Sequence, residues 1–248
     1  MKTVVVGASS GLGRCIGIGL AQRGAHVALL ARRRDKLDDA AREAGGATLA
    51  ITCDVTDEAS CREAIAEAST GLGGIDALVY APAIGVLARL ADVDADAWRR
   101  SFETNVTGAA IVTRAAIRDL TESAGTAAYL SSVSASLTPP WPGLGAYLVS
   151  KAALDKLVEA WRAEHPDVAF SRIVVGDCAG GEGDGLTQFA NAWNTDLAAE
   201  LGQEWMARNL LAGSLIDVDH LVGVVDAVLR AGSSLSIPSI TVIPRPVA

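Results

Sequence analysis

Short runs of apolar, often β-branched residues alternate along this chain with longer stretches in which apolar residues recur at helical spacing. The short runs predict strands at 3–6, 26–31, 48–53, 77–80, 127–131, 169–175 and 239–243. The longer stretches predict helices at 12–23, 35–44, 57–69, 95–102, 105–120, 147–164 and 217–229, with the third capped near Thr56. Strands buried on both faces and joined by helices indicate an α/β protein with a doubly wound parallel sheet and helices on both faces.

Neither an internal repeat nor a shift in composition divides the 248 residues, so we expect a single domain spanning 1–248. Two loops, 138–145 and the Gly-rich 176–185, follow predicted strands. In open α/β sheets ligands bind beyond the carboxyl ends of the strands. Both loops are therefore expected to border the active site.

Composition narrows the class of partner. Half of the residues are hydrophobic and 20% are charged, which excludes a disordered chain. The net charge of −8 lacks the basic footprint of a protein that binds nucleic acid or an anionic membrane surface, so a small-molecule partner is expected. The absence of a signal-peptide pattern or a spanning segment predicts a soluble, cytoplasmic protein.

The four cysteines and three histidines suggest no catalytic or metal chemistry. The cysteines form no CxxC pair and show no metal-ligand spacing, so they are interpreted as small buried hydrophobic residues. His26, His165 and His220 are scattered and point to no serine nucleophile. We expect no metal site and no hydrolase triad.

The first motif with chemical content is the turn Gly7-Ala8-Ser9-Ser10-Gly11-Leu12-Gly13 after the first strand. Glycines let a ligand approach the backbone, and the helix that begins here offers free N–H groups and the positive end of its dipole to a pyrophosphate. The alternative is a glycine-rich turn required only for close packing of helix on strand.

The second motif is Tyr147-Leu148-Val149-Ser150-Lys151 near the start of a helix. The i, i+4 spacing stacks the phenol and the ammonium group on one helix face. A nearby cation stabilises a phenolate, which suits a tyrosine to proton transfer near neutral pH. The alternative for Lys151 is a solvated helix charge.

Together the two motifs resemble the short-chain dehydrogenase/reductase family, specifically its compact branch of about 250 residues. The resemblance implies a Rossmann-like domain that binds NAD or NADP and transfers a hydride to or from a carbonyl or alcohol carbon. It extends to three further segments: Cys53-Asp54-Val55-Thr56, Phe102–Gly108 and Ser131-Ser132-Val133. In the first, Asp54 would contact adenine beside Val55, and the second carries Asn105.

The resemblance also implies the catalytic roles. Tyr147 would be the general acid/base, and Lys151 would lower its pKa and hold the nicotinamide ribose. Ser132 would hydrogen-bond the reacting oxygen, and Asn105 would hold a water that links Lys151 to solvent. The family's usual spacing fits Ser134, whereas the strand end fits Ser132, so both remain candidates and Ser132 is favoured. Ser132 as a strand end and Asn105 as a helix cap are the structural alternatives.

The end of the second strand bears on the choice of cofactor. Ala31 stands where NAD-preferring members carry Asp, and Arg32 follows it, with Arg33 or Ser9 as possible helpers toward a 2′-phosphate. The sequence therefore favours NADP(H) over NAD, and the alternative is a solvated basic start to a helix.

Several positions depart from the family pattern. Val6 replaces the usual Thr, Tyr80-Ala81-Pro82-Ala83 replaces Asn-Asn-Ala-Gly, and Gly176-Asp177 replaces Pro-Gly.

The main hypothesis is that the protein is an NADP(H)-dependent oxidoreductase that interconverts a carbonyl and a secondary alcohol. The alternative is a catalytically silent NADP(H)-binding sensor or scaffold. We expect residues 186–211 to cover the substrate, with Phe189, Trp193 and Trp205 as an apolar pocket wall or, alternatively, as a packed helix face or subunit contact. We also expect a homo-oligomer, either a tetramer or a dimer.

Overall fold

The computed structural model describes residues 1–180, 189–190, 192–232 and 234–245. Its strands are β1 (Lys2–Val6), β2 (His26–Ala31), β3 (Leu49–Thr52), β4 (Ala77–Tyr80), β5 (Thr126–Ser132), β6 (Ala169–Val175) and β7 (Ser239–Val242). Its α-helices are α1 (Gly11–Gln22), α2 (Arg34–Ala44), α3 (Glu58–Leu72), α4 (Ala95–Phe102), α5 (Gly108–Glu122), α6 (Gly145–Glu164), α7 (Thr195–Ala207) and α8 (Val218–Leu229). Short 3₁₀ turns lie at Leu90–Asp92 and Val133–Ala135, and a π-helical turn at Glu103–Thr107.

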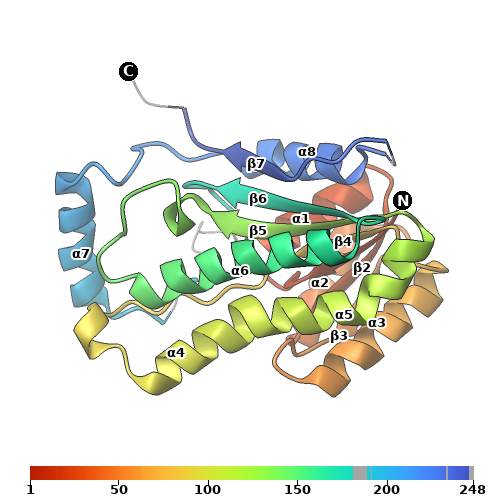
Figure 1. Cartoon of the computed structure of the whole chain (residues 1–248), viewed down its shortest axis with the longest axis horizontal. Helices are drawn as coiled ribbons and strands as arrows, with labels where there is room; N and C mark the ends of the chain where they lie inside the picture. Colours follow the sequence, from red (N-terminus) through yellow and green to blue (C-terminus); the bar gives the residue numbers. More distant parts are fainter. Residues whose placement is uncertain (181–188, 191, 233, 246–248) are drawn as a thin grey trace.

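All of these strands pair in parallel in one sheet, in the order β3-β2-β1-β4-β5-β6-β7 (Figure 1). The strand order reverses between β1 and β4, the point at which such sheets bind ligands. The predicted α/β class with a doubly wound parallel sheet is confirmed.

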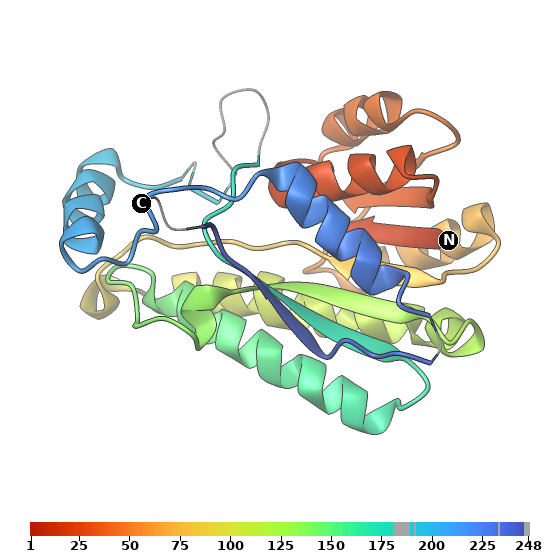
Figure 2. The same cartoon turned by 90° about the horizontal axis from the view of Figure 1, so that it is seen from above.

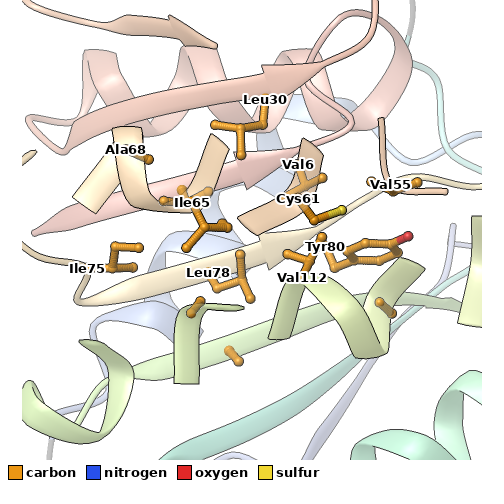
Figure 3. Close-up of a cluster of buried hydrophobic side chains, with 14 of the residues drawn as sticks. Val6, Leu30, Val55, Cys61, Ile65, Ala68, Ile75, Leu78, Tyr80 and Val112 are labelled. Atoms are coloured by element: carbon orange, nitrogen blue, oxygen red, sulfur yellow. The ribbon is translucent and has the colours of Figure 1, made fainter. Parts of the chain in front are cut away.

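Helices cover both faces of the sheet, and side-chain alternation along each strand supplies both cores. Val4 of β1 faces a core built with α3, α5 and α6, part of which Figure 3 shows. Val5 faces the second core, built with α1, α2 and α8. Figure 2 shows α6 and α8 on opposite sides of the sheet. Because both faces are buried, the strands consist of nearly continuous apolar runs.

The structure corrects two local expectations. The carboxylate of Asp57 accepts hydrogen bonds from the Ala59 and Ser60 amides at 2.8 and 3.2 Å, so Asp57 caps α3. Thr56 instead donates its hydroxyl to Asp54 at 2.8 Å. The helix expected at 105–120 also begins differently, because α4, the π-helical turn and α5 follow one another without a break.

Parts of two predicted regions lie outside the described residues, namely 181–185 of the Gly-rich loop, and 186–188 and 191 of the expected substrate cover. Among the residues that the structure does describe, none of the helices has the length and apolar character needed to cross a membrane.

Candidate active site

A cleft of about 520 Å³ lies at the carboxyl ends of the strands, at the point where the strand order reverses between β1 and β4. It collects sequence-predicted residues from turns far apart in the chain. Those that line it are Gly7, Ser9, Ser10, Gly11, Leu12, Gly13, Arg32, Arg33, Asp54, Val55, Ser132, Ser134, Tyr147 and Lys151. Asn105 is fully buried and is not among the lining residues.

The glycine-rich turn is shaped by close backbone packing. Gly7 has a φ of +81°, and a Cβ there would lie 2.8 Å from the Pro82 nitrogen. A Cβ at Gly13 would lie 2.4 Å from the Gly7 carbonyl oxygen, so α1 packs directly on the turn. Ser10 makes no side-chain cap on α1, which leaves the first amides of the helix for a ligand. The turn thus satisfies the packing interpretation and also fits a pyrophosphate.

The two arginines after β2 have different surroundings. Arg33 is half-buried and donates from Nη2 to the Ser9 hydroxyl at 3.1 Å and to the Ser9 carbonyl at 3.2 Å. Arg32 is exposed, and its charge acts on Asp54 across the cleft. Arg33 therefore ties the glycine-rich turn to the end of β2, while the guanidinium of Arg32 faces solvent.

Asp54 marks the end of the cleft expected to hold adenine. Burial acts to raise the pKa of its carboxyl, but hydrogen bonds from Thr56 and the charge of Arg32 outweigh it, so the pKa is lowered. Its Oδ1 accepts from the Thr56 amide at 3.0 Å and from the Thr56 hydroxyl. Asp54 is thus held as an oriented carboxylate beside Val55.

Tyr147 and Lys151 lie one turn apart on α6 and both face the cleft. The Lys151 Nζ is 5.9 Å from the centroid of the Tyr147 ring and donates to the Leu130 carbonyl of β5 at 2.7 Å. Burial lowers the pKa of Lys151 to about 8, and the charge of Asp155, one turn further along α6, opposes that shift.

The pKa of Tyr147 differs from expectation. Burial raises it to about 12, and the nearby Ser132 side chain only partly counters the rise. In this structure burial outweighs every lowering effect on the Tyr147 phenol, and the ammonium group of Lys151 is hydrogen-bonded to the Leu130 carbonyl. In this structure Tyr147 is therefore a protonated phenol at neutral pH.

Ser132 and Ser134 lie together at the end of β5. Their hydroxyl oxygens are 2.7 Å apart, and the Ser134 amide donates to the Ser132 oxygen at 3.2 Å. The side chain of Ser132 also acts to lower the pKa of the Tyr147 phenol, an effect that Ser134 does not have. Both serines line the cleft, and this effect favours Ser132 over Ser134 as the serine that acts together with Tyr147.

Asn105 lies within the π-helical turn, a kind of turn frequent at functional sites. Its Oδ1 accepts from the Ile84 amide at 2.9 Å, and its Nδ2 donates to the Ile84 carbonyl at 3.1 Å and to the Ser150 hydroxyl at 2.8 Å. The side chain of Asn105 joins the loop after β4 to the helix that carries Tyr147 and Lys151.

An aromatic cluster borders the end of the cleft that contains Tyr147. The Phe189 ring packs edge-on to Tyr147 with centroids 4.7 Å apart, and Trp193 packs edge-on to Phe189 at 5.3 Å. The Trp193 indole donates to the Gly85 carbonyl at 2.8 Å. Phe189 and Trp141 line the cleft, while Trp205 is buried against Trp141 and Trp193. Both interpretations of these aromatics thus hold, Phe189 as pocket wall and Trp205 as packed face.

Three groups that contact the site residues were not predicted from the sequence: the Leu130 carbonyl, Gly85 and Asp155. A backbone acceptor leaves no residue signal, and Gly85 lies in a loop without a motif. Asp155 continues the four-residue spacing from Tyr147 and Lys151, and that spacing is the signal that could have revealed it. Its carboxylate is buried, and its Oδ2 lies 3.7 Å from the Arg172 guanidinium.

The other titratable groups assemble no second centre in the part of the chain that the structure describes. No group of three or more His, Cys, Asp or Glu side chains there is arranged to hold a metal ion. Cys53 and Cys61 are buried and in contact with each other.

A doubly wound parallel sheet with a glycine-rich turn after β1 and a ligand cleft at its switch point defines the dinucleotide-binding class of α/β proteins. The family model described as short chain dehydrogenase matches residues 2–196. The chain belongs to the short-chain dehydrogenase/reductase family, a family of oxidoreductases that use nicotinamide cofactors.

Individual relatives agree. A short chain dehydrogenase of Pseudocercospora fijiensis is 35% identical over 167 residues, covering 65% of this chain and 53% of the relative. The 11-beta-hydroxysteroid dehydrogenase A of Sesamum indicum is 32% identical over 179 residues, covering 70% and 51%. The chain therefore matches about half the length of each of these relatives. A short-chain type dehydrogenase/reductase from Mycobacterium marinum superposes with a TM-score of 0.82 at 26% identity, covering 97% of this chain and 93% of that one.

Proposed function

We propose that this protein is an NADP(H)-dependent oxidoreductase that interconverts a carbonyl group and a secondary alcohol. The observation that carries the proposal is that the Ser132 side chain acts on the Tyr147 phenol in a cleft that both residues line together with Lys151. Two hydroxyl side chains that line the same part of a cleft suit the oxygen of a carbonyl.

The residues present fit a dinucleotide. The side-chain-free surface of Gly7 and Gly13 and the amides of α1 would hold the pyrophosphate, and Asp54 and Val55 would hold the adenine. Tyr147 and Lys151 would contact the nicotinamide ribose. When bound, the nicotinamide supplies or accepts the hydride.

The side chains of this protein supply the proton transfer. As hydride arrives at a carbonyl carbon, negative charge builds on the oxygen, where the Ser132 hydroxyl donates a hydrogen bond and Tyr147 donates its proton. A phenol with a pKa of about 12 holds that proton at neutral pH, which suits the reduction. Lys151, with a pKa of about 8, carries positive charge beside it at neutral pH. In the oxidation, Tyr147 takes the proton back.

The preference for NADP(H) rests on charge at the end of β2. Ala31 offers no carboxylate to repel a 2′-phosphate, and Arg32 and Arg33 both line the cleft there. For the substrate, the Phe189 and Trp141 wall favours an apolar carbonyl compound, in keeping with a relative named for a hydroxysteroid. The substrate cover over 186–211 and the homo-oligomer also belong to this proposal.

Turnover of NADPH with a panel of apolar ketones tests the function. Tyr147→Phe should lower kcat by about 10²–10⁴-fold, the usual contribution of a general acid, while NADPH affinity changes little. Tyr129→Phe is the control, since it removes a buried hydroxyl that bonds to Thr113, away from the cleft. NADPH binding without oxidation across the panel would instead favour the sensor or scaffold.

A further inference from the structure

Tyr80 stands at the end of β4, where the family pattern has an asparagine, and is completely buried. Its hydroxyl donates a hydrogen bond to the Thr104 carbonyl. Figure 3 shows its ring at the edge of the core next to Val55. The burial that surrounds it raises the pKa of the phenol well above its usual value, so it remains a donor.

The Thr104 carbonyl belongs to the π-helical turn. In an α-helix it would accept from the amide four residues on, which is that of Gly108. Here the Gly108 amide donates to the Glu103 carbonyl, five residues back. Thr104 therefore loses that donor, and the Tyr80 hydroxyl supplies one in its place.

Gly108 leaves room for this contact. A Cβ at Gly108 would lie 2.6 Å from the Tyr80 hydroxyl oxygen, and 2.9 Å from the Val55 carbonyl oxygen. The backbone of Gly108 has an ordinary helical φ of −59°, so space rather than conformation demands the glycine. Tyr80 and Gly108 thus form a matched pair at the start of α5.

The π-helical turn also positions the side chain of Asn105, the residue after Thr104. The Asn105 side chain bonds to both backbone groups of Ile84 and to the Ser150 hydroxyl. The Ser150 hydroxyl also donates to the Tyr147 carbonyl at 2.7 Å. A chain of hydrogen bonds therefore runs from the turn to the first turns of α6, where Tyr147 and Lys151 are carried.

We propose that Tyr80 is a positioning residue: its hydroxyl bond to the Thr104 carbonyl keeps the turn π-helical, so that the Asn105 side chain reaches Ile84 and Ser150. Its effect on turnover rests on the proposed function, whereas its effect on the turn does not. In this chain Tyr80, which stands where the family pattern has an asparagine, supports the turn, and Gly108, 28 residues further on, leaves the space that its hydroxyl needs.

Tyr129 provides a matched comparison. It is as fully buried as Tyr80, and its hydroxyl is bonded to the Thr113 hydroxyl at 2.6 Å. The two rings lie 6.4 Å apart in the same core. Thr113, however, lies inside α5 and not in the π-helical turn. Removing either hydroxyl costs a buried hydrogen bond, but only Tyr80 bonds to the turn.

The experiment compares Tyr80→Phe with Tyr129→Phe by amide hydrogen exchange, read at Ile84, whose amide donates to Asn105. Tyr80→Phe should accelerate exchange at Ile84 by about tenfold or more, and Tyr129→Phe by about twofold at most. With NADPH and a ketone, Tyr80→Phe should lower kcat about tenfold with KM unchanged. Equal exchange at Ile84 in the two variants overturns the proposal.

Gly108→Ala gives a second measurement, since its Cβ displaces the Tyr80 hydroxyl. It should accelerate exchange at Ile84 as Tyr80→Phe does. Gly223→Ala is the control, because a Cβ at that position of α8 meets nothing within 4 Å. An unchanged Ile84 amide in Gly108→Ala contradicts the proposal. A wild-type protein without turnover would refute the proposed function alone, since the exchange comparison still decides the role of Tyr80.

Discussion

The ammonium group of Lys151 donates a 2.7 Å hydrogen bond to the carbonyl of Leu130, joining α6 to the end of β5 behind Tyr147. Lys151 is only 2% exposed, and this contact and the charge of Asp155 stabilise the cation where burial disfavours it. The same residue that anchors α6 to β5 is therefore a source of electrostatic strain in the folded protein.

That strain has a measurable pH dependence. Burial lowers the pKa of Lys151 from 10.5 to about 8, so between these pH values the unfolded chain binds a proton that the folded chain does not. The free energy of unfolding therefore rises with pH in this window. Below about pH 8, where Lys151 is charged in the folded protein, the full free-energy cost of burying that charge lowers stability. Relative to Lys151→Met, the free energy of unfolding of the wild-type protein should rise by about 1.4 kcal/mol per pH unit between pH 8 and 10.5.

Urea denaturation of both proteins at several pH values measures this difference, from which other titrating groups cancel. Lys156→Met, which removes an exposed ammonium from the same helix, is the control and should follow the wild-type pH dependence. A flat difference between Lys151→Met and wild type would show that the lysine is not desolvated.

The paired serines make a second prediction. The Ser132 side chain acts on the Tyr147 phenol, whereas the Ser134 hydroxyl lies 2.7 Å from the Ser132 hydroxyl. Ser132→Ala should lower kcat for ketone reduction by about 10²-fold or more, the usual effect of losing one donor to a developing oxyanion. Ser134→Ala should lower it by less than about tenfold, since only the support of Ser132 is lost. Steady-state kinetics decide between them, and a larger loss in Ser134→Ala would reverse the assignment.

The fold was largely predictable because strands buried on both faces leave apolar runs that periodicity detects. All seven expected strands exist, with ends that differ by a residue or so. The motif residues likewise converge on one cleft, because parallel strands bring their carboxyl ends to one edge of the sheet.

The remaining details depend on contacts that carry no local signal. One extra residue in the π-helical turn barely disturbs helical spacing over 95–120, so Asn105 was expected in an α-helix rather than in that turn. The departure at Tyr80 was visible in the sequence, but its partner Thr104 lies 24 residues further on. The pKa values of Tyr147 and Lys151 are set by burial, which only the packed structure defines.

The arginines after β2 make a third prediction. Arg32→Asp should weaken NADPH binding by about 10–100-fold, the value of a charge-assisted hydrogen bond, and change NADH affinity much less. Arg34→Asp is the control, because Arg34 is exposed and its Nε bonds to Asp38 at 2.9 Å on the outside of α2. Fluorescence titration with both cofactors at fixed ionic strength measures the ratio. An unchanged ratio in Arg32→Asp would remove the 2′-phosphate assignment.

The contact between Gly85 and Phe189 makes the fourth prediction, on the substrate wall. A Cβ at Gly85 would lie 2.1 Å from Phe189 Cε2, so Gly85→Ala must displace the ring that packs on Tyr147. We expect it to lower kcat/KM for a bulky aryl ketone by about tenfold, because a 1 Å misplacement near reacting groups has large kinetic effects. Phe189→Ala should widen the range of accepted ketones, since it removes the wall itself. Because both changes act through one ring, Gly85→Ala should have little effect in a Phe189→Ala background, and additive effects in the double variant would show that Phe189 does not transmit the change.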